Sequence, residues 1–455
     1  MMERFNNKIL VLSYAFPPFA VAMAPCVAKA IASIENAGNA VDVLCADALF
    51  PSISKDESLL NYVTEHTSQI VRLPSEPTRR KPCIQYVQML SSFLLSRVDR
   101  YFSKLAPSYP AHMMANFFYR LSYSVNYNIG RATNIDSFSA SKKTATKALF
   151  AHLAATRYRA VLSFSPFHSI NLVPLICKRR NGSFKWIAQF SDPWSGNPLE
   201  KSRMALFLAK WFEPKVIRSA DFLIHNSQSA LDSLVECYGQ SLREKSMVIH
   251  HPFDASLYPQ RPKQKNKKIT LRHIGVLFAR RTPEPLFAAI NTLLNRRPEL
   301  SDIIAVEFIG SIEKQMLETD AAKSLPSGMV VCVSSLTYTQ SLEKMYDADI
   351  VVLIEADTKH NLFMPSKLSD YIGSRTPILG IVPMGPANKT LHQLGAWQAY
   401  PSETASIVDA LEDIIDYVRK NADTTSWCVQ SMRREFCMDY VGKQYQAILE
   451  RFETR

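Results

Sequence analysis

Two cationic side chains stand in loop positions where they could bind a phosphate. Arg281 follows an apolar run at residues 269–274 that has the pattern of a strand, and Lys367 stands where a loop enters a helical segment. A guanidinium can make a bidentate contact with a phosphate, and an ammonium supplies a compact positive charge. The alternative is that both are solvated surface cations, which contribute little. The two positions predict a phosphate-binding pair.

Residue types that bind metals are also present, but without the spacing that a metal site needs. Asp347-Ala-Asp349 matches an Asp-x-Asp metal motif, yet it closes a helical segment and leads into a strand at Ile350. We therefore expect Asp349 to cap a turn. The histidines form no His-x-x-x-His pair, and His250 and His251 would point to opposite faces of an extended segment. The sequence predicts no metal site and no cofactor other than a co-substrate.

The first element that could position a phosphate-binding site lies at the start of the chain. The run Lys8-Ile-Leu-Val-Leu-Ser-Tyr-Ala-Phe-Pro-Pro18 is followed by an apolar helical stretch and by Ala40-Val-Asp-Val-Leu-Cys45. This order indicates a buried strand, a phosphate-facing loop, a helix and a second strand, as at the opening of a nucleotide-binding α/β domain. No Gly-x-Gly-x-x-Gly follows the strand, so a dinucleotide fingerprint is excluded.

Strand and helix patterns alternate along the rest of the chain. Strands are predicted at residues 160–164, 185–190, 220–226 and 247–252, and then at 269–274, 304–309, 329–333, 350–354 and 377–381. The charged, proline-bearing segment 261–268 between the two series has the composition of an interdomain linker. The alternation predicts an α/β fold with two doubly wound, Rossmann-like domains at residues 1–260 and 269–425, facing a cleft.

A helical segment interrupts the first series at about residues 79–127. Apolar residues recur there at spacings of three and four, and Arg97, Arg100 and Lys104 lie on the other face. One interpretation is an insertion that packs on the first domain. The other is a basic, aromatic-rich surface that rests on a membrane.

Composition narrows the class of protein and of partner. The chain has 455 residues, a hydrophobic content of 47% and a net charge of +12, which favours an anionic partner. No basic stripe interleaved with aromatics indicates nucleic-acid binding. Prolines interrupt the N-terminal apolar stretch, so we expect no signal peptide there, and no apolar run is long enough to span a membrane. The prediction is a cytoplasmic protein, with possible peripheral contact at the inner face of the plasma membrane.

Four segments resemble motifs of the GT-B glycosyltransferases, in particular retaining glycosyltransferase family four. Ser165-Pro-Phe-His-Ser169 and Gln189-Phe-Ser-Asp-Pro-Trp194 are similar to the Pro-x-His-Ser and Asp-Pro-Trp motifs of a bacterial branch. Gly275-Val-Leu-Phe-Ala-Arg-Arg281 is similar to the loop that opens the second domain, and Pro365-Ser-Lys-Leu-Ser-Asp-Tyr371 to a donor-site motif. The resemblance implies a GT-B fold whose terminal helix, residues 426–455, returns to the first domain.

The resemblance also implies roles for individual residues. The implied catalytic residues are His168, which would contact the transferred sugar, and Asp192, which would orient the acceptor hydroxyl. The implied donor-binding residues are Gly275, Arg281, Ser366, Lys367, Asp370 and Gly385, and the implied acceptor-binding residues are Tyr14, Pro18 and Trp194. Alternatively, His168 is an exposed loop residue, Asp192 builds a turn, and Trp194 packs in a core.

The predicted function is transfer of a sugar from a nucleotide-sugar donor to a glycan or lipid-linked acceptor, with retention. The resemblance places this reaction in cell-surface polysaccharide or lipopolysaccharide biosynthesis. One alternative is a nucleotide-sugar epimerase or synthase of the same fold. The other is a catalytically silent partner that docks at the membrane, because Leu362 replaces the first family glutamate and the first loop lacks glycines. The motifs do not specify the sugar or the nucleotide base of the donor.

Overall fold

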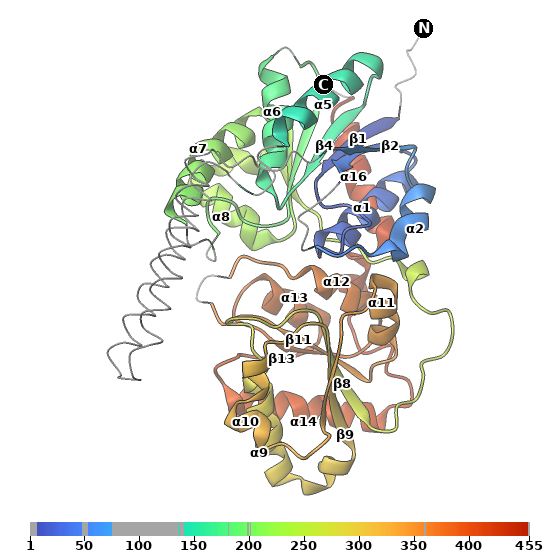
Figure 1. The fold of residues 1–455 in the computed structure, drawn as a ribbon, viewed down its shortest axis with the longest axis vertical. Helices are drawn as coiled ribbons and strands as arrows, with labels where there is room; N and C mark the ends of the chain where they lie inside the picture. Colours follow the sequence, from blue (N-terminus) through green and yellow to red (C-terminus); the bar gives the residue numbers. More distant parts are fainter. Residues whose placement is uncertain are drawn as a thin grey trace, which may run out of the picture.

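The computed structural model describes residues 7–47, 53–74, 136, 141–180, 182–197, 200, 202–358 and 361–453. The described residues form two lobes, one above the other in Figure 1. The upper lobe contains the first half of the chain, and the lower lobe contains most of the second half. The helical segment predicted at residues 79–127, with its basic face, lies outside the described residues.

A seven-stranded parallel sheet forms the centre of the upper lobe, in the order β3-β2-β1-β4-β5-β6-β7. Its strands are β1 (Lys8–Ser13), β2 (Ala40–Ala46), β3 (Gln69–Leu73), β4 (Ala160–Phe164), β5 (Trp186–Phe190), β6 (Phe222–His225) and β7 (Ser246–Val248). The central strands are continuous apolar runs because helices bury both faces of a parallel sheet. The helices are α1 (Met23–Asn36), α2 (Leu60–Glu65), α5 (Lys142–Ala155), α6 (Leu172–Arg179), α7 (Arg203–Ser219) and α8 (Gln228–Tyr238).

The lower lobe repeats this plan with a six-stranded parallel sheet in the order β10-β9-β8-β11-β12-β13. Its strands are β8 (Ile269–Ile274), β9 (Ile304–Ile309), β10 (Val330–Val333), β11 (Ile350–Ile354), β12 (Ile378–Ile381) and β13 (Trp397–Ala399). The helices are α9 (Glu284–Arg296), α10 (Asp320–Lys323), α11 (Tyr338–Tyr346), α12 (Ser366–Gly373), α13 (Pro386–Leu394), α14 (Thr404–Lys420) and α15 (Gln430–Arg434). Short 3₁₀ turns lie in the loops, at Glu57–Leu59, His168–Asn171, Gln240–Lys245, Ala255–Leu257, Pro298–Asp302 and Lys314–Leu317.

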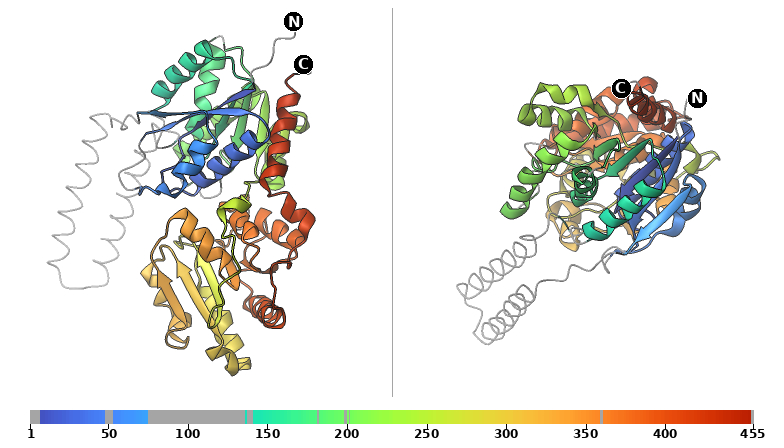
Figure 2. Two further views of the ribbon diagram at one scale, coloured as in Figure 1. Left: turned by 90° about the vertical axis from the view of Figure 1, so that its right-hand side faces the viewer. Right: turned by 90° about the horizontal axis from the view of Figure 1, so that it is seen from above.

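The helix α16 (Met438–Glu450) crosses back to the upper lobe and packs on α1. Figure 2 shows this red helix running along the upper lobe. Val441, Tyr445 and Ile448 belong to the same buried cluster as the strands β1 and β2. The Tyr445 hydroxyl donates a hydrogen bond to the side chain of Gln189 at 2.6 Å. Gly442 permits this approach, because a Cβ there would lie 2.3 Å from the carbonyl oxygen of Ser33.

The strand order reverses at one point in each sheet. β1 pairs with β4 in the upper lobe, and β8 pairs with β11 in the lower lobe. Loops at the carboxyl ends of two such strands diverge and leave a crevice, which is where open parallel sheets bind ligands. We therefore expect the loops after β1, β4, β8 and β11 to contribute to a site. The domain boundaries at residues 260, 269 and 425 stay predictions.

Candidate functional site

A cleft of about 600 Å³ lies between the two lobes at these strand ends. Its upper wall is formed by residues 21–23, Pro25, 166–167, 191–192, Asn226 and His251. Its lower wall is formed by residues 274–276, Arg281, 355–356, Thr358, Asn361, 363–367, Asp370 and side chains of α11. Of the donor-site residues named from the sequence, Gly275, Arg281, Ser366, Lys367 and Asp370 line this cleft.

The predicted phosphate-binding cations meet on the lower wall. Arg281 makes an ion pair with Glu355, the residue that directly follows β11, at 2.5 Å. Burial, with a smaller contribution from repulsion by Arg281, lowers the pKa of Lys367 to about 8, although Glu355 opposes this shift. The two cations are thus close enough to influence each other, and a bound anion would relieve their repulsion.

The backbone around Lys367 is also suited to bind an anion. Lys367 and Ser366 form the first turn of α12, where helix amide groups have no intrahelical partner and the helix dipole favours an anion. Gly275 has a φ of 138°, and a Cβ on it would lie 2.7 Å from the ammonium nitrogen of Lys367. Glycine therefore makes room for the lysine at the cleft wall.

Asp370 lies deeper in the cleft and links the two lobes. Its Oδ1 atom accepts hydrogen bonds from the ammonium of Lys29 and, at 2.9 Å, from the hydroxyl of Tyr338. Lys29 comes from α1 of the upper lobe and is 1% exposed, so this is a buried ion pair across the lobe interface. The amide of Tyr338 also bonds to the upper lobe, to Asp56 at 2.6 Å.

Asp192 stands on the upper wall, where the cleft opens into a side pocket of about 210 Å³. The side pocket is lined by Asp136, Pro166, Phe167, His168, Asp192, Pro193, Trp194, Asn197, Glu200, Ala205, Leu206 and Ala209. Burial raises the pKa of Asp192 to about 6. Because burial takes water away from this carboxylate, its ionised form gains from a hydrogen bond that a bound hydroxyl donates. Its place between the two cavities makes it a candidate for that contact.

His168 and Trp194 lie in the side pocket, away from the lower wall of the cleft. Their rings are stacked, with centroids 4.9 Å apart and an interplanar angle of 8°. Burial lowers the pKa of His168 to about 3, and a hydrogen bond to the backbone of Pro193 opposes this only in part. His168 is therefore a neutral imidazole at physiological pH, so it can exchange hydrogen bonds but cannot serve as a cation.

Three residues named from the sequence are not among those that line the cleft or the side pocket. Tyr14 is 2% exposed and packs in the core of the upper lobe, and burial raises its pKa. Pro18 turns its carbonyl oxygen to the amide of Asp56, at 2.6 Å. Gly385 starts α13, where a Cβ would lie 2.8 Å from the carbonyl oxygen of Asn361. The backbones of Pro18 and Gly385 thus pack against neighbouring loops.

The structure adds residues to the cleft that the sequence patterns did not single out. Glu355, His251, Tyr338 and the buried Lys29 all belong to the cleft or to its hydrogen-bond network. Lys29 stood out only as a lone charge in an apolar helical stretch, and Glu355 as an acid after an apolar strand. Within the described residues, polar atoms at the cleft that are buried without a partner include Ser191 Oγ, His251 Nδ1, Arg281 Nε and Glu355 Oε1. Such atoms are costly unless a polar ligand or water meets them.

The Asp-x-Asp pair, Asp347 and Asp349, is not among the residues that line the cleft. Its carboxylates form hydrogen bonds with the linker between the lobes, residues 261–268. Asp347 accepts two hydrogen bonds from the guanidinium of Arg261, at 2.9 and 2.7 Å. Asp349 accepts hydrogen bonds from the side chain of Asn266 at 2.9 Å and from the amide of Thr270 at 2.8 Å. Both carboxylates therefore stabilise the linker between the lobes. No cluster of three or more possible metal ligands occurs among the described residues.

None of the helices in the described part of the chain combines the length and apolar character needed to cross a membrane.

Comparisons with known proteins found solved structures with a similar fold, but no match by sequence. No family model matches the sequence, and a search of curated proteins found no match. Solved structures resemble the chain over nearly its whole length. HepE from Anabaena, in complex with UDP and glucose, is 14% identical with a TM-score of 0.59, covering 97% of this chain and 99% of HepE. Sucrose-phosphate synthase from Thermosynechococcus elongatus is 14% identical with a TM-score of 0.62, covering 98% and 99%.

A third solved structure has the same overall arrangement. The trehalose-6-phosphate synthase OtsA is 10% identical with a TM-score of 0.60, covering 97% of this chain and 99% of its own. The chain has the GT-B fold. This confirms the predicted fold class, two Rossmann-like lobes that face a cleft. The GT-B fold is shared by nucleotide-sugar-dependent glycosyltransferases, and at these identities the likeness establishes the fold alone.

Proposed function

We propose that this GT-B protein is a glycosyltransferase that moves a sugar from a nucleotide-sugar donor to a glycan or lipid-linked acceptor. The observation that carries the proposal is the arrangement of charge across one cleft. Arg281, Lys367 and the first turn of α12 form a cationic lower wall, and Asp192 stands on the upper wall at the entrance to a second pocket.

The lower wall is the proposed donor side. When the sugar leaves its nucleotide, the bond between the anomeric carbon and the phosphate oxygen breaks and the diphosphate keeps the electron pair. Arg281, Lys367 and the α12 amides would stabilise this growing negative charge without rearrangement. No described residue bonds to Oδ2 of Asp370, so this oxygen can accept the ribose hydroxyls of the donor. HepE has been solved with UDP-glucose, which makes UDP the first nucleotide to try here.

The upper wall is the proposed acceptor side. An acceptor hydroxyl in the side pocket would donate a hydrogen bond to ionised Asp192 while its oxygen bonds to the anomeric carbon. The proton of the acceptor hydroxyl is transferred to the departing diphosphate or to water. Neutral His168, stacked on Trp194, would hold a sugar hydroxyl beside it. We propose that the reaction retains the anomeric configuration and belongs to cell-surface polysaccharide or lipopolysaccharide assembly.

The charge needed at the diphosphate is supplied by side chains, so we also propose that the reaction requires no divalent metal. Turnover should survive a chelator, and Asp347→Asn should affect the linker and leave nucleotide affinity unchanged. Loss of turnover with EDTA and recovery with manganese would contradict this assignment.

Calorimetric titration with UDP, beside donor hydrolysis by the full-length protein, tests the proposed function. The parent should bind UDP and release it slowly from UDP-glucose, and Arg281→Ala should weaken UDP binding. Lys314→Ala is the control, because its side chain is 89% exposed and is not among the residues that line the cleft. Binding of UDP without release from any nucleotide sugar would favour the catalytically silent alternative. Failure to bind nucleoside diphosphates at all would refute the proposal.

A further inference from the structure

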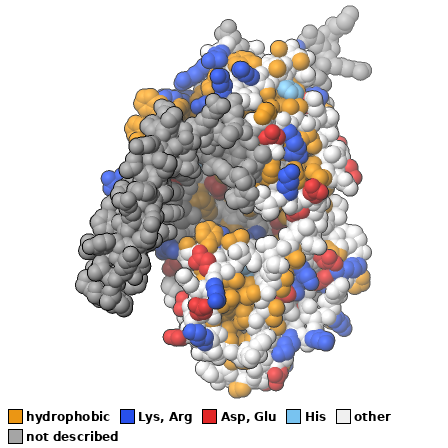
Figure 3. All heavy atoms as spheres, in the orientation of Figure 1, with side chains coloured by type: hydrophobic (Ala, Val, Ile, Leu, Met, Phe, Trp, Pro, Cys, Tyr) orange, Lys and Arg blue, Asp and Glu red, His pale blue; other side chains and the backbone are white. Residues whose placement is uncertain are grey.

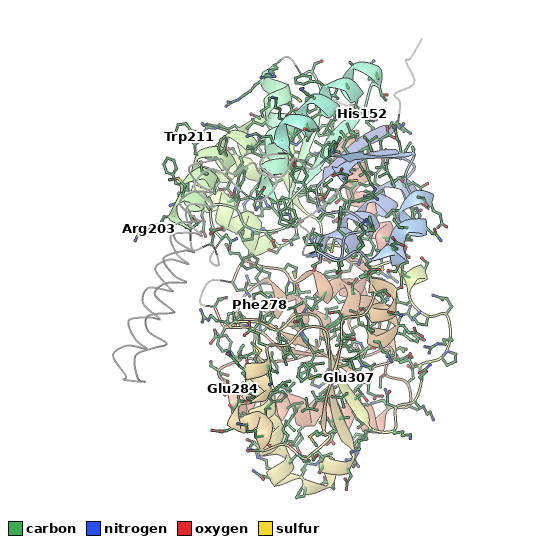
Figure 4. The ribbon with its side chains drawn as sticks, viewed as in Figure 1. His152, Arg203, Trp211, Phe278, Glu284 and Glu307 are labelled. Atoms are coloured by element: carbon green, nitrogen blue, oxygen red, sulfur yellow. The ribbon has the colours of Figure 1, made fainter. Side chains whose placement is uncertain are left out.

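The helix α7 in the upper lobe carries an unusual outward face. Phe207 is 60% exposed, Trp211 is 57% exposed and Met204 is 41% exposed, and the three lie at helical spacings on one side. Large apolar side chains are rarely exposed together on a soluble surface unless a partner covers them. Figure 4 shows the labelled side chains of Arg203 and Trp211 at the outer edge of this lobe.

Positive charges alternate with these apolar side chains along the same helix. Arg203, Lys210 and Arg218 are exposed, and the ammonium of Lys215 lies 3.6 Å from the centre of the Trp211 ring. Partial desolvation, followed by repulsion from Arg179 and Arg218, lowers the pKa of Lys215, which shows how closely the cations are grouped. In Figure 3, orange and blue side chains lie together at the upper left edge, where Figure 1 places α7.

No carboxylate balances this charge on the helix, which is described over its full length. The single acid of α7 is Glu213, and it points inward. It is 1% exposed and accepts hydrogen bonds from the Tyr238 hydroxyl at 2.8 Å and from Ser195. The outward face is therefore apolar and cationic at once. This is the composition of a helix that lies in the headgroup region of an anionic bilayer.

The other side of the same helix forms part of the side pocket. Ala205, Leu206 and Ala209 of α7 line that pocket together with Asp192 and Trp194. A surface that touches α7 from outside would thus be separated from the proposed acceptor site by the width of one helix, about 10 Å. A lipid-linked acceptor anchored in that surface could enter the side pocket without leaving the bilayer.

We propose that the outward face of α7 docks the protein on a membrane rich in anionic phospholipid, so that the acceptor enters the side pocket from the lipid surface. This deepens the proposed function, since it rests on the side pocket being the acceptor site. A protein partner would also cover apolar side chains, but a helix face whose exposed charges are all positive is complementary to a uniformly anionic surface rather than to the mixed charges of a typical protein surface.

Vesicle sedimentation with the full-length protein tests the docking surface without donor or acceptor. The parent should bind vesicles that contain phosphatidylglycerol, bind pure phosphatidylcholine vesicles weakly, and release as salt is raised. The double variant Lys210→Glu/Arg218→Glu should lower the partition coefficient at least about tenfold. The double variant Phe207→Ala/Trp211→Ala should lower it about tenfold, and Trp211→Phe should abolish any blue shift of tryptophan fluorescence on binding.

A matched control lies on α16, where Tyr440 is 41% exposed and Lys443 is exposed one turn away. The double variant Tyr440→Ala/Lys443→Glu should bind vesicles like the parent. UDP affinity and donor hydrolysis should stay at the parent level in all α7 variants, which separates failure of docking from failure of the proposed function. Equal vesicle binding by the parent and the α7 variants would overturn the proposal. So would a parent dimer that Trp211→Ala converts to a monomer, because a second copy would then be the partner.

Discussion

At the scale of single residues, Lys367 is the cation whose charge the cleft controls most strongly. Its pKa is lowered to about 8 because burial, and to a lesser degree Arg281, disfavour the ammonium form. A bound diphosphate would stabilise that form. The charge that the proposed leaving group needs is therefore present below pH 8 and lost above it.

We expect Lys367→Ala to weaken UDP binding about 10- to 100-fold, since a charge-assisted hydrogen bond contributes about 1.5–3 kcal/mol. In the parent, the affinity should fall several-fold between pH 7 and pH 9, as the protonated fraction drops from about 90% to about 10%. Titration calorimetry across this range measures both effects. The pH dependence should be absent in Lys367→Ala, and a variant that keeps it would assign the titration to another group.

Asp192 should produce the acidic limb of the pH–rate profile. Because burial raises its pKa to about 6, the ionised form that accepts the acceptor hydroxyl is lost as the pH falls below 6. Asp192→Asn should lower the transfer rate about 100-fold or more and remove this limb. Ionising the buried carboxyl costs folding free energy between its unfolded pKa near 3.8 and about 6, so Asp192→Asn should be at least as stable as the parent at pH 7. A stable variant with an unchanged profile would exclude Asp192 from the reaction.

How well the sequence predicted the site varies from residue to residue. Arg281, Lys367 and Asp192 line the cleft because each follows a strand or opens a helix, positions that the sequence pattern of strands and helices locates. Lys29 could not be assigned in this way, since its partner Asp370 is 341 residues away in the sequence. Tyr14 was predicted to contact an acceptor but is in the core, because the direction of a side chain in an irregular loop cannot be derived from spacing.

At the scale of secondary structure elements, the turn after β8 determines where Lys367 can lie. Gly275 has a positive φ there, and its missing side chain leaves the space that the ammonium occupies. This turn therefore couples the end of a strand to the start of α12.

We expect Gly275→Ala to reduce UDP affinity about tenfold or more, because a Cβ would displace the ammonium of Lys367. Gly328→Ala is the matched control, since Gly328 also has a positive φ, of 77°, but open space around it. Both variants should lose about 1 kcal/mol of stability from backbone strain, and only Gly275→Ala should lose affinity. Calorimetry with thermal unfolding separates the two effects, and equal UDP affinities in the two variants would show that the turn does not position Lys367.

Most strands were predicted within one or two residues, because buried parallel strands are continuous apolar runs. The predictions at 160–164, 269–274, 304–309 and 350–354 match β4, β8, β9 and β11. The strand predicted at 247–252 is shorter and ends at Val248. This edge strand has a neighbour on one side only, and the residues after it turn toward the cleft, where His251 lies.

At the scale of the whole molecule, the ion pair between Lys29 and Asp370 joins the lobes at the base of the cleft. It is almost fully buried, at 1% and 9% side-chain exposure, and Tyr338 shares the same carboxylate oxygen. The two lobes are thus held together at the position where the donor ribose is proposed to bind. Closure of the cleft and occupation of the donor site would therefore favour each other.

We expect Lys29→Met to destabilise the protein by about 3–5 kcal/mol, because it leaves the Asp370 carboxylate buried without its partner. The double variant Lys29→Met/Asp370→Asn should regain part of that loss, with a coupling of about 1–3 kcal/mol in chemical unfolding. Small-angle scattering of Lys29→Met should show a larger radius of gyration. Lys8→Met is the control, since its partner Asp42 lies within the upper lobe at 2.9 Å, and it should leave the radius unchanged. Strictly additive single variants would mean that the pair does not couple the lobes.

The return of α16 to the upper lobe also sets an order for making the protein. The core around β1 and α1 includes Val441, Tyr445 and Ile448, which the ribosome adds only after the whole lower lobe. Between residue 260 and residue 450, synthesis takes on the order of 10–40 s at ordinary translation rates. Throughout that interval the nascent upper lobe exposes the apolar side of α1 that α16 will later cover. The part of the chain made first is therefore among the last to be completed, and a nascent-chain chaperone has a defined surface to protect until then.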